Sequence, residues 1–179
     1  MQLGEYYMSS LIALCVSIGV LGGVATYLAL GPLAGFILIW GIFIGWATFF
    51  ALGGDNAALK KGITCNVFGA VCAWLMAIIL LNTALGDLGA IGAGVAVGAT
   101  VLGMCLAAHL PALDSIPAIV YGYAATAAYL LHTDGAMLMG PLASANFSNA
   151  LILVSVSLVV GALFGLGSGK LGGVLTSGE

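Results

Sequence analysis

Charged side chains are almost absent from this chain of 179 residues, which carries three lysines, six acidic residues and no arginine. About a quarter of the residues in a typical soluble domain are charged. Because hydrophobic residues make up 63% of the sequence and fill the long stretches between charges, the expected solvent is lipid rather than water. The net charge of −3 is also too small to favour nucleic acid as a partner, and we expect none.

Six apolar stretches are long enough to cross the hydrocarbon core of a bilayer as helices. The stretches are continuous rather than alternating, which predicts α-helices and not the strands of a membrane barrel. We therefore predict an all-α, polytopic membrane protein that forms one transmembrane domain over residues 1–179. The predicted spans are residues 8–30, 33–52, 62–82, 88–109, 112–132 and 147–167.

The three lysines predict the orientation of these spans. With six crossings, Lys60, Lys61 and Lys170 all fall on the side of the two termini. Lysine and arginine are enriched in cytoplasmic loops of membrane proteins. We therefore expect both termini in the cytoplasm.

The two halves of the chain share an order of features. Three spans is an odd number, so a second copy must enter the bilayer from the opposite side, as in an inverted repeat. We predict one repeat over about residues 8–82 and another over about 88–167, with Asn66 and Asn146 as symmetry mates. The matched features are Pro32 and Pro111, Gly45–Ala51 and Gly122–Ala128, Asp55 and Asp134, and the runs Thr64-Cys65-Asn66 and Ser144-Ala145-Asn146.

Two proline-containing segments interrupt corresponding points of the halves, residues 31–35 and 111–117. Interruptions at corresponding points of two repeats are the best pointer in a transporter sequence to a binding site. The alternative is that both are tight turns between antiparallel helices, where proline is common.

Small residues recur at spacing four in every predicted span. In lipid, close van der Waals approach along such stripes drives helix packing. The stripes predict a tight bundle, and in so small a protomer some of them are expected to serve a homo-oligomer. They are Gly19/Gly23, Gly41/Gly45, Gly69/Ala73/Ala77, Ala90/Gly94/Gly98, Ala118/Gly122/Thr126 and Ser157/Gly161/Gly165/Gly169.

No catalytic grouping is evident in the sequence, so we expect no enzymatic activity. It lacks a Ser/His/Asp order at usable depth, an HExxH motif and a phosphate-binding loop. His109 and His132 end successive predicted spans and fall on opposite membrane faces. The four cysteines have no partner ligands at metal-binding spacing, so neither a metal nor another cofactor is expected.

Polar residues inside or beside the spans are the candidate pathway residues: Thr48, Asn66, Asp114, Thr126 and Asn146. A buried amide must find a partner, either on a neighbouring helix or on a passing polar solute. Uncharged hydroxyls and amides suit a small neutral solute. Asp114 is the exception, because an ionisable residue at membrane depth indicates function, whereas in an interfacial turn it only caps a helix.

Several local features resemble the YcdZ-like family of small bacterial inner-membrane proteins, a domain of unknown function. The resemblance implies a multi-span protein of the bacterial inner membrane and brings no assigned substrate or functional residue. The chain departs from the family by an insertion, Asp114-Ser115, before Pro117. The features are Ala34-Gly35-Phe36, Gly45–Ala51, Gly53-Gly54, Lys61-Gly62 with Trp74 downstream, Leu110-Pro111, and Ile116-Pro117 followed by Gly122 and Thr126.

Together these observations predict a channel or facilitator for a small neutral polar molecule the size of urea, a small amide or ammonia. A proton-coupled transporter that uses Asp114 is one alternative. A membrane subunit that docks a partner protein without transporting anything is another.

Overall fold

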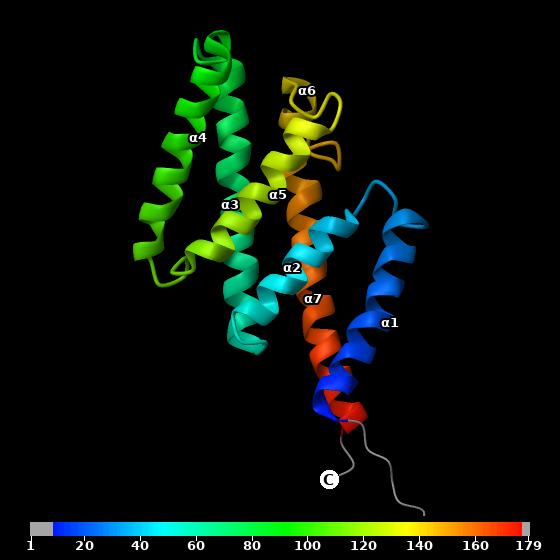
Figure 1. Cartoon of the computed structure of the whole chain (residues 1–179). Helices are drawn as coiled ribbons and strands as arrows, with labels where there is room; N and C mark the ends of the chain where they lie inside the picture. The colour runs from blue at the N-terminus through cyan, green and yellow to red at the C-terminus, as the bar shows by residue number, and fades with distance from the viewer. Residues whose placement is uncertain (1–8, 177–179) are drawn as a thin grey trace, which may run out of the picture.

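The computed structural model describes residues 9–176, and these residues contain helices and connecting segments but no strand (Figure 1). Over residues 9–176, four helical segments are long and apolar enough to cross a membrane, which supports a membrane protein. They are α1 (Ser10–Leu30), α3 (Asn56–Asn82), Gly86–His109, and α7 (Ala150–Thr176). The third of these consists of α4 (Gly89–Leu106) between the short 3-10 turns η1 (Gly86–Leu88) and η2 (Ala107–His109).

Two predicted spans form shorter helices than expected. α2 (Ile39–Ala51) has 13 residues and α5 (Ile116–His132) has 17, whereas a perpendicular crossing needs about 20. Both helices run obliquely across the longer ones (Figure 1). The predicted spans 33–52 and 112–132 begin too early, because the chain is not helical over residues 31–38 and 110–115. Pro32 and Pro111 thus lie in connections between consecutive helices, as the alternative of turns between helices expects, and Pro117 lies in the first turn of α5.

The third helix of each half is longer than predicted. α3 begins at Asn56, six residues before the predicted start, because the Asp55 carboxylate accepts a hydrogen bond of 2.7 Å from the Ala58 amide and caps the helix. α7 begins after Asn149, whose side chain accepts from the Leu151 amide, and it continues to Thr176. A five-residue helix, α6 (Met139–Ala143), lies in the connection that precedes α7.

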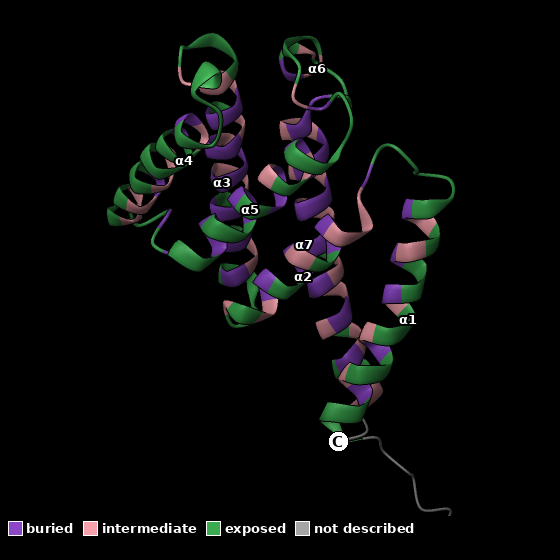
Figure 2. Ribbon diagram, turned by 45° about the horizontal axis from the view of Figure 1, so that its top comes forward, coloured by how far each residue is buried: buried purple, intermediate pink, exposed green. Residues whose placement is uncertain are grey.

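The helices form two three-helix bundles, and each bundle combines helices from both halves of the sequence. α2 packs chiefly against α7, and α5 packs chiefly against α3. α1 joins the first pair and α4 joins the second. We call α1, α2 and α7 the first bundle, and α3, α4 and α5 the second bundle. Buried residues concentrate on α3 and α7, while α1 and α4 are exposed along their outer faces (Figure 2).

Glycines allow helix backbones to touch at the centre of each bundle. In the first bundle, a Cβ on Gly45 would overlap the Leu158 carbonyl, and one on Gly161 would overlap the Ile42 carbonyl. In the second bundle, Gly122 meets the Asn66 carbonyl in the same way, and Gly69 meets the Ile119 carbonyl. Such close approach replaces the hydrophobic force that helices lack in lipid.

The segment that precedes each oblique helix is held by a side chain of the helix on which it packs. The Leu38 amide, which precedes α2, donates to Ser157 Oγ of α7 at 2.8 Å. The Cys65 thiol of α3 donates to the carbonyl of Ala112, in the segment that precedes α5, with 3.8 Å between sulfur and oxygen. The glycine contacts relate the two bundles position by position, because α2 corresponds to α5 with one constant offset and α7 corresponds to α3 with another. The counterparts are Ile42/Ile119, Gly45/Gly122, Leu158/Asn66 and Gly161/Gly69.

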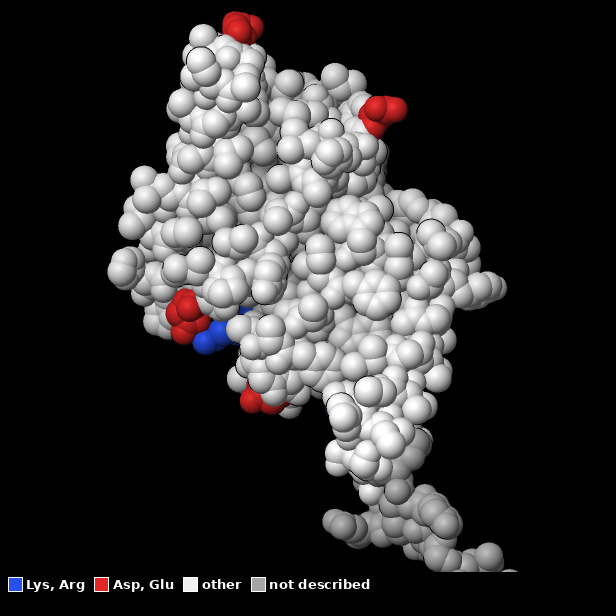
Figure 3. All heavy atoms as spheres, in the orientation of Figure 1, with Lys and Arg blue, Asp and Glu red and all other residues white. Residues whose placement is uncertain are grey.

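On the visible face, acidic side chains lie near the top, and a second group of charged side chains lies at the lower left and lower middle, above the lower ends of α1 and α7 (Figure 3). The surface between these two levels is uncharged (Figure 3). Leucine, valine and isoleucine side chains are exposed on α1 and α4. An apolar zone between two charged levels is expected of a protein in a bilayer.

Candidate functional site

A polar contact lies at the boundary between the two bundles. Thr48 of α2 and Asn66 of α3 are 1% and 0% exposed, and Thr48 Oγ1 lies 3.4 Å from Asn66 Oδ1. The Thr48 hydroxyl also donates to the Ile44 carbonyl at the shorter distance of 2.8 Å. Asn66 Nδ2 has no hydrogen-bond partner among residues 9–176. An unpaired buried donor carries a desolvation cost of about 1–3 kcal/mol.

Three of the five predicted pathway residues lie in the core, and two of them touch. Thr126 of α5 is fully buried and donates to the Gly122 carbonyl at 3.0 Å. Gly122 is the residue that packs on the backbone of Asn66. The structure therefore brings Thr48 and Asn66 together and places Thr126 one helical turn along α5 from the residue that covers Asn66.

Asn146 lies elsewhere, in the exposed loop before α7. Its Oδ1 accepts from the backbone amide and hydroxyl of Ser148, at 2.8 and 2.7 Å, so it organises the loop. The predicted pairing of Asn66 with Asn146 does not match the contacts, because the residue in the position equivalent to Asn66 is Leu158.

Asp114 is an exposed loop residue that forms an ion pair with Lys61 of α3, at 2.7 Å. The side chains of Asp114 and Lys61 are 46% and 39% exposed. Asp114 does not cap α5, because Ser115 holds the N-cap position and makes no side-chain cap bond. Exposed ion pairs of this kind are screened by salt and contribute little.

If the protein transports a solute, as the sequence predicts, we expect Asp114→Asn to leave the uptake rate nearly unchanged, because the carboxylate is at the surface and outside the buried boundary. The measurement is solute uptake into proteoliposomes with and without an imposed pH gradient, alongside the midpoint of thermal unfolding. Lys61→Gln removes the other partner of the same pair and serves as the matched variant. A pH-dependent uptake that disappears only in Asp114→Asn would instead support proton coupling through this residue.

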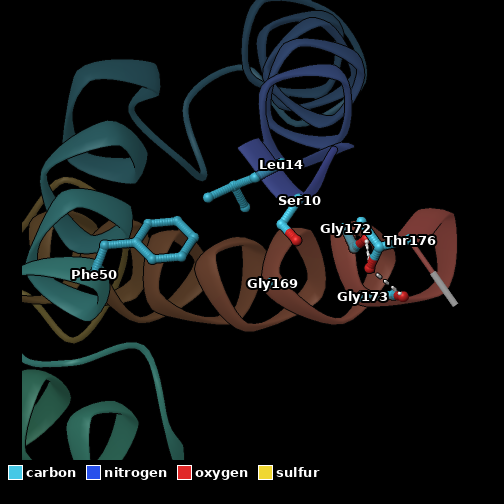
Figure 4. Close-up of a pocket in the computed structure, with 7 residues that line it drawn as sticks. All are labelled: Ser10, Leu14, Phe50, Gly169, Gly172, Gly173 and Thr176. Carbon is cyan, nitrogen blue, oxygen red and sulfur yellow. Dashed lines mark hydrogen bonds between the residues drawn. The ribbon is translucent and has the colours of Figure 1, made fainter. Parts of the chain in front are cut away.

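Three surface cavities lie away from the Thr48–Asn66 contact. A cavity of about 250 Å³ sits between the start of α1 and the end of α7 (Figure 4), where the Thr176 hydroxyl bonds back to its own helix. One of about 340 Å³ lies at the end of α5 beside Asp134, and an apolar groove of about 210 Å³ runs between α1 and α2. None of these three is lined by Thr48, Asn66 or Thr126.

Within the described part of the chain, no three His, Cys, Asp or Glu side chains gather in a group able to hold a metal ion. The chemistry of the boundary site is therefore that of one carboxamide and one hydroxyl.

The family model of DUF1097, described as a protein of unknown function, matches residues 15–173. The chain belongs to the DUF1097 family. No match is found among curated proteins or among solved structures. The family description assigns no role to any residue, so the geometry of the boundary site is the guide to function.

Two residues that hold the segments before the oblique helices, Ser157 and Cys65, were not predicted from the sequence. Both lie one position before a residue whose carbonyl is covered by a glycine. Ser157 belongs to a predicted small-residue stripe, but spacing alone does not identify the backbone group that a hydroxyl or thiol will meet.

Proposed function

We propose that this protein is a channel or facilitator that moves a small neutral polar solute, the size of urea, a small amide or ammonia, across a bilayer. The observation that carries the proposal is the buried Thr48–Asn66 contact, in which the Asn66 amide lacks a partner. Buried polar groups in native proteins are nearly always paired, and the exceptions need an explanation. A passing solute that hydrogen-bonds to Asn66 supplies one.

The proposed topology is six crossings arranged as two inverted repeats, residues 8–82 and 88–167, within one domain. α2 and α5 cross together with the non-helical segments that precede them, residues 31–38 and 110–115. The matching glycine contacts of the two bundles support this arrangement. So does the location of the start of α1 and the end of α7 at the same end of the molecule (Figure 1).

We place the protein in the bacterial inner membrane with both termini in the cytoplasm. Two features of the sequence support this placement: the position of all three lysines on the side of the termini, and the resemblance to the YcdZ-like family.

The proposed pathway runs between the two bundles. The glycines that allow two helix backbones to touch, such as Gly45 and Gly122, pack within a bundle. The chain passes from the first bundle to the second at residues 52–55, where Gly53 and Gly54 have φ values of +114° and +72°. Two tightly packed units joined by such a turn can rock against each other around a site at their boundary, as repeats of transporters do.

We also propose that the protein forms a homo-oligomer. Gly19 and Gly23 on α1, and Gly94 and Gly98 on α4, have open space where a side chain would lie. These small-residue stripes are left outside the packing of the protomer and are available for contact with a second copy.

Reconstitution of the full chain into proteoliposomes tests the proposed function. Stopped-flow light scattering would follow the volume change after an osmotic step with urea, formamide, acetamide or glycerol, and pH-sensitive dye would follow ammonia. We expect faster entry of at least one of these solutes than into protein-free vesicles. Equal rates across the whole panel would overturn the proposal, and co-purification of a fixed partner in that case would favour the docking subunit.

A further inference from the structure

The buried contact between Thr48 and Asn66 has an apolar counterpart at an equivalent place in the same molecule. Asn66 and Leu158 occupy equivalent positions: each carbonyl is covered by a glycine of an oblique helix, and each follows a residue, Cys65 or Ser157, that hydrogen-bonds to the segment before that helix. Thr48 and Ala125 are equivalent in the same sense, because each lies three residues after that glycine. The polar pair Thr48/Asn66 therefore corresponds to the apolar pair Ala125/Leu158 at the equivalent position of the bundle boundary.

The apolar pair is sufficient for packing. Ala125 and Leu158 are 2% and 1% exposed and belong to one buried cluster across the bundle boundary. The same backbone arrangement thus forms without a carboxamide or a hydroxyl at this position. Since an unpaired amide is a cost to the fold, packing does not account for the choice of Asn66 over leucine.

The carboxamide of Asn66 keeps hydrogen-bonding capacity at both of its ends. Nδ2 carries two hydrogens and has no acceptor among the described residues. Oδ1 accepts one long hydrogen bond, from Thr48 Oγ1 at 3.4 Å, and the same hydroxyl also donates to the Ile44 carbonyl at 2.8 Å. Because a carboxamide oxygen has two lone pairs, one edge of the side chain presents an unpaired donor next to an acceptor that can take a second hydrogen bond.

We infer that Asn66, assisted by Thr48, is a recognition site for the O=C–NH₂ group of urea and small primary amides. The carbonyl oxygen of such a solute accepts from Nδ2, and its N–H donates to Oδ1, so two parallel hydrogen bonds form at once. An ammonium ion offers donors alone and leaves Nδ2 unpaired. This inference rests on the proposed function, because Asn66 is fully buried and a solute reaches it only where the two bundles part.

The test converts the site into a copy of its counterpart, with Asn66→Leu and Thr48→Ala in the full chain. We expect the thermal unfolding midpoint to stay at or above that of the parent, because an unpaired buried donor is removed. Urea and acetamide entry into proteoliposomes should fall at least tenfold, to the rate of protein-free vesicles. The matched control is Leu158→Ile, which changes packing at the equivalent position and should keep the parental rates.

The outcomes separate the inference from the proposed function. Parental rates of urea and acetamide entry in the double variant would overturn the recognition site and leave a facilitator standing. No entry of any solute with the parent chain would overturn both. Should the double variant fail to fold, Asn66→Asp keeps the side-chain shape and removes the two N–H donors, and unchanged amide entry in it would overturn the inference as well.

Discussion

Replacing Gly122 with alanine is expected to prevent the second bundle from closing. The added Cβ would overlap the carbonyl oxygen of Asn66, and both atoms belong to helix backbones that cannot move aside as a side chain can. α5 would have to withdraw from α3, which also opens the contact between Gly69 and Ile119. We expect a loss of about 3 kcal/mol or more, at the upper end of overpacking effects. Thermal unfolding and the yield of monodisperse protein in detergent measure it.

The control for Gly122→Ala is Gly103→Ala on α4, where no atom lies within 4 Å of the added Cβ. Alanine is favoured over glycine inside a helix by about 1 kcal/mol, so Gly103→Ala should unfold at the parental midpoint or above it. Gly45→Ala should resemble Gly122→Ala, because the Leu158 carbonyl takes the place of the Asn66 carbonyl. A Gly122→Ala protein as stable as the parent would contradict backbone contact between α3 and α5.

The sequence predicts the class of this fold well, because length and hydropathy alone decide which segments can cross lipid. It also marks the glycines that bring helices together, since Gly45 and Gly122 both lie on predicted small-residue stripes. It does not separate these stripes from those of α1 and α4, which have the same spacing but face outward. The difference arises from tertiary structure, which decides the partner that each face meets.

The residue-by-residue correspondence between the two halves differs from the one that the sequence predicts. Matching short polar runs pairs Asn66 with Asn146, whereas the contacts pair it with Leu158. The physical reason is the connection before the third helix of each half. It is a short turn at residues 52–55 in one half and a long loop with α6 at residues 133–149 in the other. An alignment that gives both connections the same length pairs the wrong residues of α3 and α7. The true counterparts of α3 residues on α7 are mostly apolar, and in so apolar a chain they do not stand out in the sequence.

Fixing the two bundles to each other is expected to abolish transport. Ala125 of α5 and Leu158 of α7 lie in one buried cluster but belong to different bundles. A disulfide between Ala125→Cys and Leu158→Cys would tie the bundles together at the counterpart of the polar site and leave Thr48 and Asn66 intact. We expect solute entry to fall to the rate of protein-free vesicles on oxidation and to recover on reduction. The background should carry alanine in place of Cys15, Cys72 and Cys105, and serine in place of Cys65 so that a donor to the Ala112 carbonyl is kept.

A second disulfide, placed within one bundle, distinguishes fixation of the boundary from the presence of a cross-link. Ser17 of α1 donates to the Ser168 carbonyl of α7 at 2.8 Å, and both residues are fully buried in the first bundle. The variant with Ser17→Cys and Ser168→Cys in the same background should therefore show the same rate of solute entry when oxidised and when reduced. If the Ala125–Leu158 cross-link forms completely and solute still enters as fast as it does with the chemically reduced protein, the pathway does not depend on separation of the bundles. Passage would then have to avoid the boundary at which Asn66 is buried.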